Sequence, residues 1–262
     1  MSRDLVSIIV PVYKAEKFIK QCIENLLIQT YNNIEIITVY DKSPDRSLEV
    51  LKSYESDIKL IVQNKKTNPA TARNVGLHYA NGRYIAFCDA DDYFALDKIE
   101  RQVKILQENP NVGLVYTDII QVDHEGNEIG RITCPEWDRE YWLSNRFIAF
   151  SSILIRREIL EDLKEKDGYY FDENLPAFDD FDLLIRLSAK TKFKRVPKFL
   201  TYLRFHSENL SKDIHKMNII RAKIQWKHKL LKHWAKSVLY TIPRDYISSF
   251  YKSFKKEIKK WK

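Results

Sequence analysis

Short apolar runs alternate with amphipathic segments through the first half of the chain. Four almost wholly apolar runs predict strands buried on both faces of a sheet; they are residues 5–10, 34–39, 58–62 and 84–88. Helical spacing of apolar side chains predicts helices over 15–29, 69–80 and 96–108. A further helix is predicted to follow the polar loop 41–45 and to end at about residue 54. We expect Asn81-Gly82 to stop the third helix, because glycine readily adopts the left-handed conformation that ends helices. Strand–helix alternation at this pitch predicts an α/β fold around a mainly parallel sheet.

The pattern changes in the second half. A polar turn at 123–127 separates strand-like runs at 112–122 and 128–133, which predicts a hairpin. Helical spacing returns later in the chain, and a short strand is predicted near its end; these elements are the helices 156–164 and 181–189 and the strand 200–205. Residues 134–150 are rich in aromatic side chains and show neither the apolar spacing of a helix nor that of a strand, so we assign them no element.

Polar clusters follow each of the first four predicted strands. They lie at residues 11–13, 41–45, 64–68 and 89–92. The carboxyl ends of parallel strands lie at one edge of a sheet, and ligands bind outside that edge. We therefore expect the four clusters to meet there.

Composition limits the class of protein. The chain has 262 residues, 44% apolar and 31% charged, which is enough for one large domain with a sizeable core. It contains no run of about 18 apolar residues, the length that a membrane-spanning helix needs. Its N-terminus enters a strand-like run without the pattern of a secretory leader, so we expect a cytoplasmic protein. Cys22, Cys88 and Cys134 have no metal-type spacing and are expected to be core residues.

Charge is distributed unevenly along the chain. Residues 212–262 hold 15 Lys and Arg against 3 Asp and Glu, whereas residues 1–211 hold 29 against 33. We divide the chain accordingly into a body, 1–211, and a basic helical tail, 212–262. The tail predicts an anionic partner. Nucleic acid is disfavoured, because a protein that binds a duplex should be basic where it docks, and the body is mildly acidic.

The tail has two parts. Between residues 213 and 240, apolar residues at helical spacing are expected to pack on the body; they are Met217, Ile220, Ile224 and Leu231. Residues 244–262 place aromatic side chains on one face of a helix and lysines on the other. That arrangement suits an anionic membrane surface. A helix docked on a partner subunit is the alternative, so an oligomer stays possible.

The glycines argue against two nucleotide-binding classes. The chain has 6 glycines, and none lies between Val10 and Gln29, where a dinucleotide-binding turn or a P-loop would need them. A bound nucleotide diphosphate would therefore need a metal ion and side chains to offset its charge.

Three carboxylates in four positions follow the predicted strand 84–88. They are Asp89, Asp91 and Asp92. Carboxylates this close repel one another, and a divalent cation with oxygen ligands offsets the repulsion. An isolated Asp-x-Asp is more often a helix cap or an acidic turn, so the rest of the chain must decide.

Six segments, in order, resemble those of family 2 glycosyltransferases and together cover roughly residues 5–211. They are 6–13 (VSIIVPVY), 39–45 (VYDKSPD), 72–76 (ARNVG), 87–92 (FCDADD), 171–173 with 179–183 (FDE, DDFDL), and 204–206 (RFH) with Ser211. One segment alone would be weak evidence, but the ordered set is strong. The resemblance implies the GT-A fold, a Rossmann-like, mixed and mainly parallel sheet flanked by helices.

The resemblance also implies residue roles. The nucleotide-sugar would be bound by Pro11, Val12, Tyr13, Asp41, Arg73, Asp89, Ala90 and Arg204, with the first three lining the base pocket. A Mg²⁺ or Mn²⁺ ion would be held by Asp91, with Asp89 and His206 as further ligands, although a structural role for His206 is equally open. Asp180 would be the general base that takes the proton of the acceptor hydroxyl.

The implied reaction fits these residue types. A divalent ion offsets the charge on a departing diphosphate, and a single carboxylate base opposite the leaving group permits one displacement with inversion. We expect a UDP-sugar donor and a glycan or lipid-linked acceptor in polysaccharide biosynthesis, with the protein peripheral at the inner face of the membrane. The alternatives are an inert glycosyltransferase-like body that binds membrane or nucleic acid through its tail, and a sugar-phosphate nucleotidyltransferase. The second needs a glycine-rich first loop, which is missing.

Some residues near the matched segments have simpler interpretations. Asp45 is interpreted as a helix cap rather than a ligand. Asp179 and Asp182 are interpreted as helix-start charges that favour the helix dipole, although their repulsion would raise the pKa of Asp180. Three aromatic residues either stack on a sugar acceptor or cover the sheet; they are Trp137, Tyr141 and Trp142.

The chain departs from the family pattern at three places. Tyr40 and Lys42 replace an Asp and a Gly, which either changes the base or sugar preference or stiffens the turn. Residues 65–68 lack the usual glycine, and Asp179 stands where Glu is commoner. None of these changes removes an essential group, so we expect an active enzyme.

Overall fold

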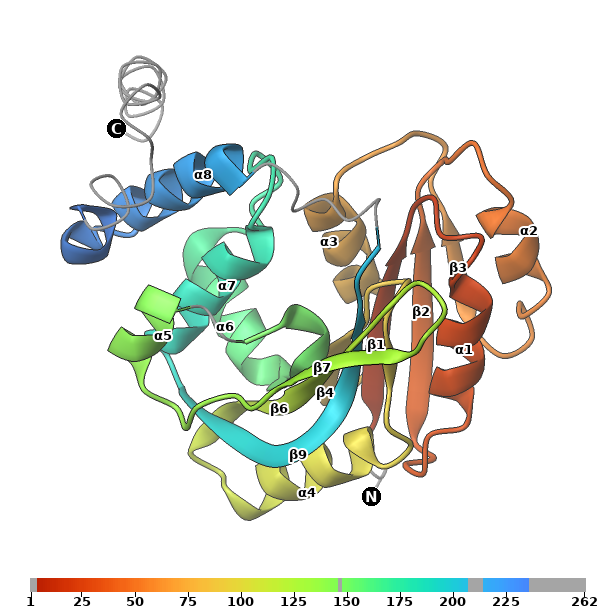
Figure 1. Ribbon diagram of the computed structural model, residues 1–262, viewed down its shortest axis with the longest axis horizontal. Coiled ribbons are helices and arrows are strands. Elements are labelled where there is room, and N and C mark those ends of the chain that lie inside the picture. Colours follow the sequence, from red (N-terminus) through yellow and green to blue (C-terminus); the bar gives the residue numbers. More distant parts are fainter. Residues whose placement is uncertain (1–3, 146–147, 207–213, 236–262) are drawn as a thin grey trace.

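The computed structural model describes residues 4–145, 148–206 and 214–235. In this part of the chain a 9-stranded sheet has the order β3-β2-β1-β4-β8-β6-β9-β5, with β7 paired to β6 (Figure 1). The strands are β1 (Val6–Val12), β2 (Ile34–Tyr40), β3 (Lys59–Val62), β4 (Tyr84–Phe87), β5 (Tyr93–Phe94), β6 (Val112–Val122), β7 (Glu128–Ile132), β8 (Ile153–Arg156) and β9 (Lys192–Arg204). The helices are α1 (Ile19–Leu27), α2 (Ser47–Lys52), α3 (Pro69–Tyr79), α4 (Lys98–Glu108), α5 (Arg139–Asn145), the 3₁₀ turn η1 (Phe150–Ser152), α6 (Arg157–Asp167), α7 (Asp179–Ser188) and α8 (Ile214–Lys227).

The first four strands pair with one another only in parallel. β1 pairs in parallel with β2 and β4, and β2 pairs in parallel with β3. β8 then pairs antiparallel with β4 and β6, while β6 and β9 are parallel. The predicted α/β class with a mixed sheet and flanking helices is confirmed, and the loops after β1 to β4 lie at one edge.

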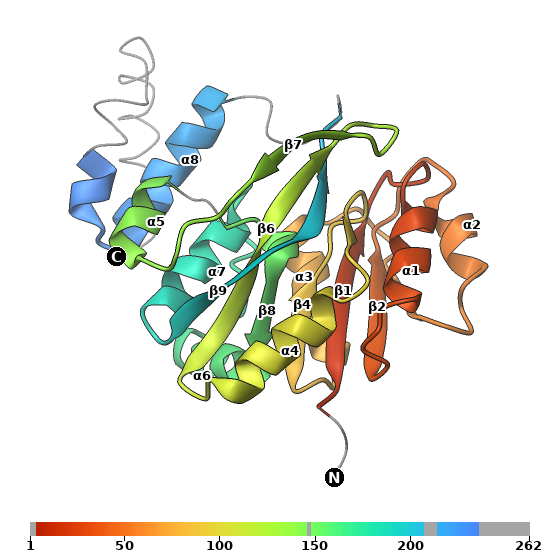
Figure 2. The same ribbon diagram turned by 60° about the horizontal axis from the view of Figure 1, so that its bottom comes forward.

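Helices cover both faces of the sheet, as Figures 1 and 2 show together. Alternate residues of each strand point to opposite faces, so Ile8 packs in one hydrophobic cluster with α1, α2 and α4. Ile9 packs in a second cluster, with α3, α6, α7 and α8. The predicted core cysteines are all buried and free.

The end of α3 differs from the prediction. Ala80 follows the helix in extended conformation, and Gly82 does not adopt a left-handed conformation. A Cβ atom on Gly82 would lie 2.5 Å from the backbone nitrogen of Ser7. Gly82 therefore permits a close approach of two chain segments and does not cap the helix.

Three strands depart from the predicted pattern. β5 and β8 were not predicted, and β9 begins eight residues before the predicted strand. The first half of β9 reads as KFKRVPK and carries charged side chains, which hide its strand period. Its pairing with β6 is also irregular between Thr117 and Ile119.

The described beginning of the tail packs on the body. Ile220 and Ile224 of α8 belong to the same hydrophobic cluster as Ile9 of β1, as predicted. Leu231, which shares their helical spacing, is instead 57% exposed.

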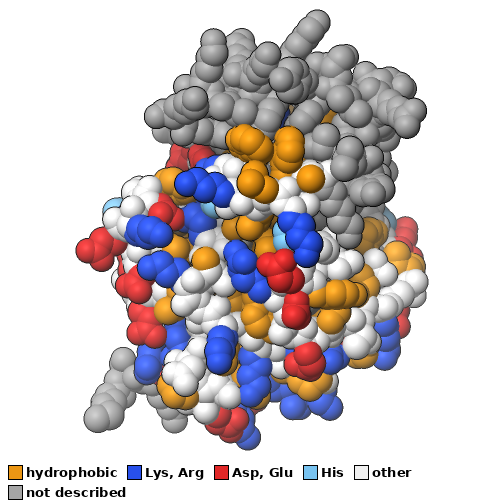
Figure 3. Space-filling model, turned by 90° about the vertical axis from the view of Figure 1, so that its left-hand side faces the viewer, with side chains coloured by type: hydrophobic (Ala, Val, Ile, Leu, Met, Phe, Trp, Pro, Cys, Tyr) orange, Lys and Arg blue, Asp and Glu red, His pale blue; other side chains and the backbone are white. Residues whose placement is uncertain are grey.

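On the face that Figure 3 shows, basic and acidic side chains intermingle. Among the described residues no helix has the length and apolar character needed to cross a membrane. The predicted membrane-facing segment, 244–262, and Ser211 lie outside the described residues.

Candidate active site

The loop after β4 brings Asp91 close to His206. His206 follows the end of β9, and its Nε2 atom lies 2.9 Å from Asp91 Oδ2. The two groups form a hydrogen bond in the structure. The predicted metal role of both residues stays a prediction.

The described residues do not form a complete metal cage. Among them, no group of three or more His, Cys, Asp or Glu side chains is arranged to hold a metal ion. Proteins commonly hold Mg²⁺ through one or two carboxylates, with substrate phosphates and water as the other ligands. Asp91 is a carboxylate at the edge where such a substrate is predicted to bind.

Asp92 lies in the same loop and has a structural environment. It is 5% exposed. Ser151 Oγ donates a hydrogen bond to its Oδ2 at 2.6 Å, and the backbone N–H of Arg204 donates to its Oδ1 at 3.1 Å. Burial, together with the charges of Asp91 and Asp89, raises the pKa of Asp92 well above its ordinary value. The two hydrogen bonds favour the ionised form, but burial and the neighbouring carboxylates outweigh them.

Arg204 supports this loop from inside the protein. Its Nε donates to the carbonyl oxygen of Asp91 at 3.0 Å, and Nη1 donates to those of Asp123 and His124 at 3.0 and 2.7 Å. Nη2 donates to Gln21 Oε1 at 2.6 Å. These bonds fix the backbone at Asp91. The predicted contact of Arg204 with the nucleotide-sugar stays a prediction.

Arg73 joins the loop after β4 to α7. Its Nη2 lies 3.0 Å from Asp89 Oδ1, and its Nη1 lies 2.7 Å from Asp179 Oδ2. The guanidinium lies 4.9 Å from the ring centre of Phe150 and 5.8 Å from that of Phe171. Burial opposes the charge, but the carboxylates of Asp179 and Asp89 outweigh it and raise the pKa of Arg73. Among the described residues, its buried Nε has no hydrogen-bond partner.

Asp180 has the properties expected of a general base. It is half-buried in the first turn of α7, and the N–H of Phe181 donates to its Oδ1 at 2.7 Å. Burial, followed by the charge of Asp179, raises the pKa of Asp180 to about 6. Such a group is ionised at neutral pH and still basic enough to take a proton. Phe178, just before the helix, has a φ of 60°, a costly conformation for a bulky residue that is often found near functional sites.

Asp179 and Asp182 lie in the first turn of α7, as the interpretation as helix-start charges requires. Their burial was not predicted: the exposed fractions are 5% and 0%. Asp179 bonds to Arg73, and Asp182 bonds to cationic side chains of α7 and α8. Of the two, Asp179 is the one that raises the pKa of Asp180. The substitution of Asp for the commoner Glu at 179 has no explanation in the structure.

The predicted base pocket consists of interlocked loops after β1, β2 and β3. Asp41 is 5% exposed; it accepts hydrogen bonds from Gln63 Nε2 at 2.6 Å and from Thr67 N–H at 2.8 Å. Pro11 is half-buried and Val12 is 1% exposed, so Val12 is almost wholly covered in the structure. The predicted convergence of these loops is confirmed. Their predicted contacts with the nucleotide stay predictions.

Lys66 is a residue that sequence reasoning missed. It lies in the segment without the usual glycine, and its Nζ is 4.4 Å from the ring centre of half-buried Tyr13. It therefore places a cation at the predicted nucleotide pocket. An exposed lysine in a polar loop is too common for the sequence to have distinguished it.

Other residues stiffen the same edge. The hydroxyl of Tyr40 accepts a hydrogen bond from Ser43 N–H at 3.0 Å and lies 3.2 Å from its carbonyl oxygen, which favours the stiffening role for this substitution. Asp45 accepts hydrogen bonds from Ser47 Oγ at 2.7 Å and from Glu16 N–H at 3.0 Å. Asp45 is structural, as expected, although Arg46 holds the cap position of α2.

Most of the remaining candidates are core residues. Ala90 is 8% exposed and Trp142 1% exposed. Trp137 lies 4.2 Å from the ring of Phe193 in β9. Both tryptophans therefore cover the sheet, while Tyr141 is 50% exposed.

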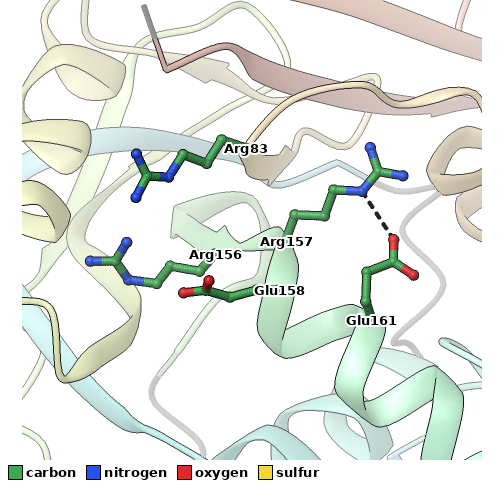
Figure 4. A pocket seen from close by; sticks show the side chains of 5 residues that line it. All are labelled: Arg83, Arg156, Arg157, Glu158 and Glu161. Atoms are coloured by element: carbon green, nitrogen blue, oxygen red, sulfur yellow. Dashed lines mark hydrogen bonds and ion pairs between the residues drawn. The ribbon is translucent and has the colours of Figure 1, made fainter. Parts of the chain in front are cut away.

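Two cavities have linings that do not include Asp89, Asp91 or Asp180. One of about 680 Å³ lies between α3, the 169–176 segment and α8. A smaller one of about 270 Å³ is lined by Arg83, Arg156, Arg157, Glu158 and Glu161 (Figure 4). Arg83 precedes β4, so the smaller cavity lies at the opposite edge from Asp89. Its arginines are engaged: Arg156 donates to the carbonyl oxygen of Val112 at 2.9 Å, and Arg157 Nε donates to Glu161 at 3.0 Å.

Comparisons with other sequences point to one family. The model of Glycosyl transferase family 2 matches residues 7–164. An uncharacterized glycosyltransferase from Haemophilus influenzae is 34% identical over 180 residues, which are 65% of this chain and 72% of the relative. The UDP-Glc:alpha-D-GlcNAc-diphosphoundecaprenol beta-1,3-glucosyltransferase WfgD from Escherichia coli is 32% identical over 187 residues, 67% of this chain and 73% of the relative. Some relatives are longer: this chain spans 29% of one from Rickettsia bellii.

Solved structures share the fold. S. aureus TarS in complex with UDP-GlcNAc has a TM-score of 0.68 at 19% identity, covering 95% of this chain and 71% of that one. The mannosyltransferase PcManGT from Pyrobaculum calidifontis, in complex with GDP-Man and Mn²⁺, has a TM-score of 0.61 at 21% identity, covering 95% and 68%. At these identities the likeness shows the fold alone.

Proposed function

The chain belongs to glycosyltransferase family 2, and on that premise we propose that it transfers a sugar from a nucleotide-sugar to a hydroxyl group, with inversion and with Asp180 as the general base. One observation carries the proposal. Asp180, whose pKa is raised to about 6, is next to Asp179 in the chain. Arg73 joins Asp179 to Asp89, in the loop after β4. A basic carboxylate and a candidate diphosphate site are thus held in one rigid unit.

The donor is proposed to bind at the edge formed by the loops after β1 to β4. Asp91 and His206, 2.9 Å apart, would hold a Mn²⁺ or Mg²⁺ ion, which offsets charge on the diphosphate when it is bound. The loops around Asp41 and Tyr13 would hold the base and ribose, with Lys66 close to the ring of Tyr13. We expect a UDP-sugar, because WfgD is named for UDP-Glc and TarS binds UDP-GlcNAc.

The transfer step needs one base. A carboxylate oxygen of Asp180 takes the proton of the acceptor hydroxyl as that oxygen forms a bond to the anomeric carbon. The bond between the anomeric carbon and the diphosphate oxygen breaks at the same time, and the electron pair leaves with the diphosphate. Attack on the face opposite the leaving group inverts the configuration in one displacement. A second, nucleophilic carboxylate is needed only for a double displacement.

The acceptor is proposed to be a glycan or a lipid-linked saccharide of polysaccharide biosynthesis. The name of WfgD describes a diphosphoundecaprenol-linked acceptor. A lipid-linked acceptor lies at a membrane surface, where the lysines and aromatic residues of 244–262 would bind anionic lipid. We place the protein at the inner face of the cell membrane on this chemistry.

The donor assignment can be tested by thermal unfolding. The protein is melted with UDP-, GDP-, CMP- and dTDP-sugars, each with Mn²⁺ or with a chelator. A ligand that binds only the folded state at a hundredfold excess over its Kd stabilises it by about 2.7 kcal/mol. A Mn²⁺-dependent rise in Tm with one nucleotide class, lost in Asp91→Asn, supports the proposal and names the base. No rise with any donor would favour an inert body.

A further inference from the structure

The tail bonds directly to the helix that carries Asp180. Asp182 of α7 is fully buried, and its Oδ1 lies 2.9 Å from Lys227 Nζ, at the end of α8. His228 Nε2 lies 2.8 Å from the same oxygen. Arg186 Nε donates to Oδ2 at 3.0 Å. Two of these three partners come from the tail, which the charge pattern alone associates with an anionic surface.

Lys227 has a second carboxylate partner. Its Nζ lies 2.7 Å from Asp172 Oδ2, in the segment that leads into α7. The neighbours of Asp172 reach the active site: the ring of Phe171 lies against Arg73, and Glu173 Oε2 accepts a hydrogen bond from Thr71 of α3 at 2.9 Å. One ammonium group therefore connects α8, α7 and this segment.

The electrostatics show that the connection is strong. Burial would raise the pKa of Asp182, but the hydrogen bond from His228 and the charges of Lys227 and Arg186 outweigh it and lower that pKa well below its ordinary value. Burial likewise opposes the charge of Lys227, and Asp182 and Asp172 outweigh it and raise its pKa. A buried charge that loses its partner is strongly unfavourable. The docking of α8 therefore adds two partners to Asp182 beside Arg186 of α7 itself, and so stabilises the start of α7 in this position.

We infer that Lys227 is a positioning residue for sugar transfer, which holds the first turn of α7 so that Asp180, two residues before Asp182, meets the acceptor hydroxyl. The inference rests on the proposed function, because it needs Asp180 to be the base. It makes the beginning of the tail a part of the catalytic unit. A small misplacement of a catalytic group costs up to about 100-fold in rate, so a loose α7 should slow transfer without weakening donor binding.

The test uses the full chain and compares Lys227→Met with Lys229→Met. Lys229 is exposed and two residues away, so its replacement removes the same charge without the buried contacts. Two quantities are measured for each: kcat per folded molecule at saturating donor, acceptor and Mn²⁺, and the donor-induced rise in Tm. For Lys227→Met we expect kcat to fall at least about tenfold with the rise in Tm unchanged. Lys229→Met should match the parent, and Lys227→Arg should recover most of the loss.

If Lys227→Met melts lower but keeps the parent kcat per folded molecule, Lys227 is only structural and the inference fails. If Lys227→Met does not fold, Lys227→Gln, which keeps a hydrogen-bond donor, takes its place, and its kcat per folded molecule is compared with that of the parent. If the parent itself transfers no sugar from any donor, the proposed function fails and this inference fails with it.

Discussion

Two clusters in this protein have nearly the same composition and different chemistry. Each has three aspartates within four positions: Asp89, Asp91 and Asp92 after β4, and Asp179, Asp180 and Asp182 at the start of α7. Each gives one carboxylate to Arg73, through Asp89 in the first cluster and Asp179 in the second. Each also buries one carboxylate completely or nearly so and leaves one for a proposed chemical role.

The buried members differ in the charge of their partners. Asp92 accepts from a hydroxyl and a backbone N–H, and its pKa is raised. Asp182 is held by Arg186 and Lys227, and its pKa is lowered. Equal burial thus gives a carboxyl that favours its proton in one cluster and one that loses it in the other. The partners, and not the carboxylate pattern, decide the charge state.

The remaining members differ in the same way. Asp91 Oδ2 is hydrogen-bonded to His206 Nε2 at 2.9 Å, and the two are proposed to share a cation. Asp180 accepts a hydrogen bond from the backbone N–H of Phe181, and its pKa is raised to about 6 by burial and Asp179. The first arrangement favours binding of a cation, and the second favours uptake of a proton.

The largest expected effect that separates the clusters is on turnover. Asp180→Asn keeps the size of the side chain and removes the base, so kcat should fall by about 10²–10⁴-fold. The donor-induced rise in Tm should persist, because the proposed donor contacts lie in the loops after β1 to β4 and not in α7. Steady-state kinetics and thermal unfolding of the same sample measure both quantities. A variant that keeps parental kcat would remove Asp180 from the mechanism.

The next effect concerns stability. Asp182→Asn removes the buried charge that Arg186 and Lys227 share, and should cost about 3 kcal/mol in the free energy of unfolding, because Asp167 and Asp172 remain as their second partners. Asp92→Asn replaces a carboxyl that favours its proton with an amide of similar shape and should cost less than about 1.5 kcal/mol. Urea unfolding at pH 7 measures both. Equal losses would contradict the assignment of opposite charge states.

A smaller effect distinguishes the two histidines that face these clusters. His206→Ala should raise the Mn²⁺ concentration needed for half of the donor-induced rise in Tm by at least about tenfold. His228→Ala is the matched control, since His228 pairs with Asp182 instead. It should leave the Mn²⁺ requirement unchanged. Equal shifts in the two variants would argue against His206 as a ligand.

The sequence shows the members of both clusters and not their partners. Periodicity predicted the parallel strands, because buried strands read as continuous apolar runs. It could not predict that Lys227, in a basic tail, lies 2.9 Å from Asp182, since a lysine 45 residues away is one of many. For the same reason Asp182 was interpreted only as a helix-start charge. β9 was underestimated because its first half carries lysines and an arginine.

Helical spacing predicted the burial of some apolar residues of the tail and not of others. Ile220 and Ile224 are buried as the pattern predicts, and Leu231 is exposed because α8 ends at Lys227. Hydrophobic period holds only as long as the helix continues. The resemblance to family 2 sequences supplied the site residues and their predicted roles, and the structure supplied the contacts between distant segments.

The pH dependence of a single turnover by the parent protein tests the assignment of Asp180 most directly. With the Asp180 pKa raised to about 6, the base is ionised above that pH and protonated below it. Single-turnover transfer, measured with saturating donor and Mn²⁺ so that binding does not limit the rate, should be constant above pH 7. It should fall towards tenfold per pH unit below pH about 6, and Asp180→Asn should lack this decline. A flat profile from pH 8 to 5, or a decline that persists in Asp180→Asn, would contradict Asp180 as the base.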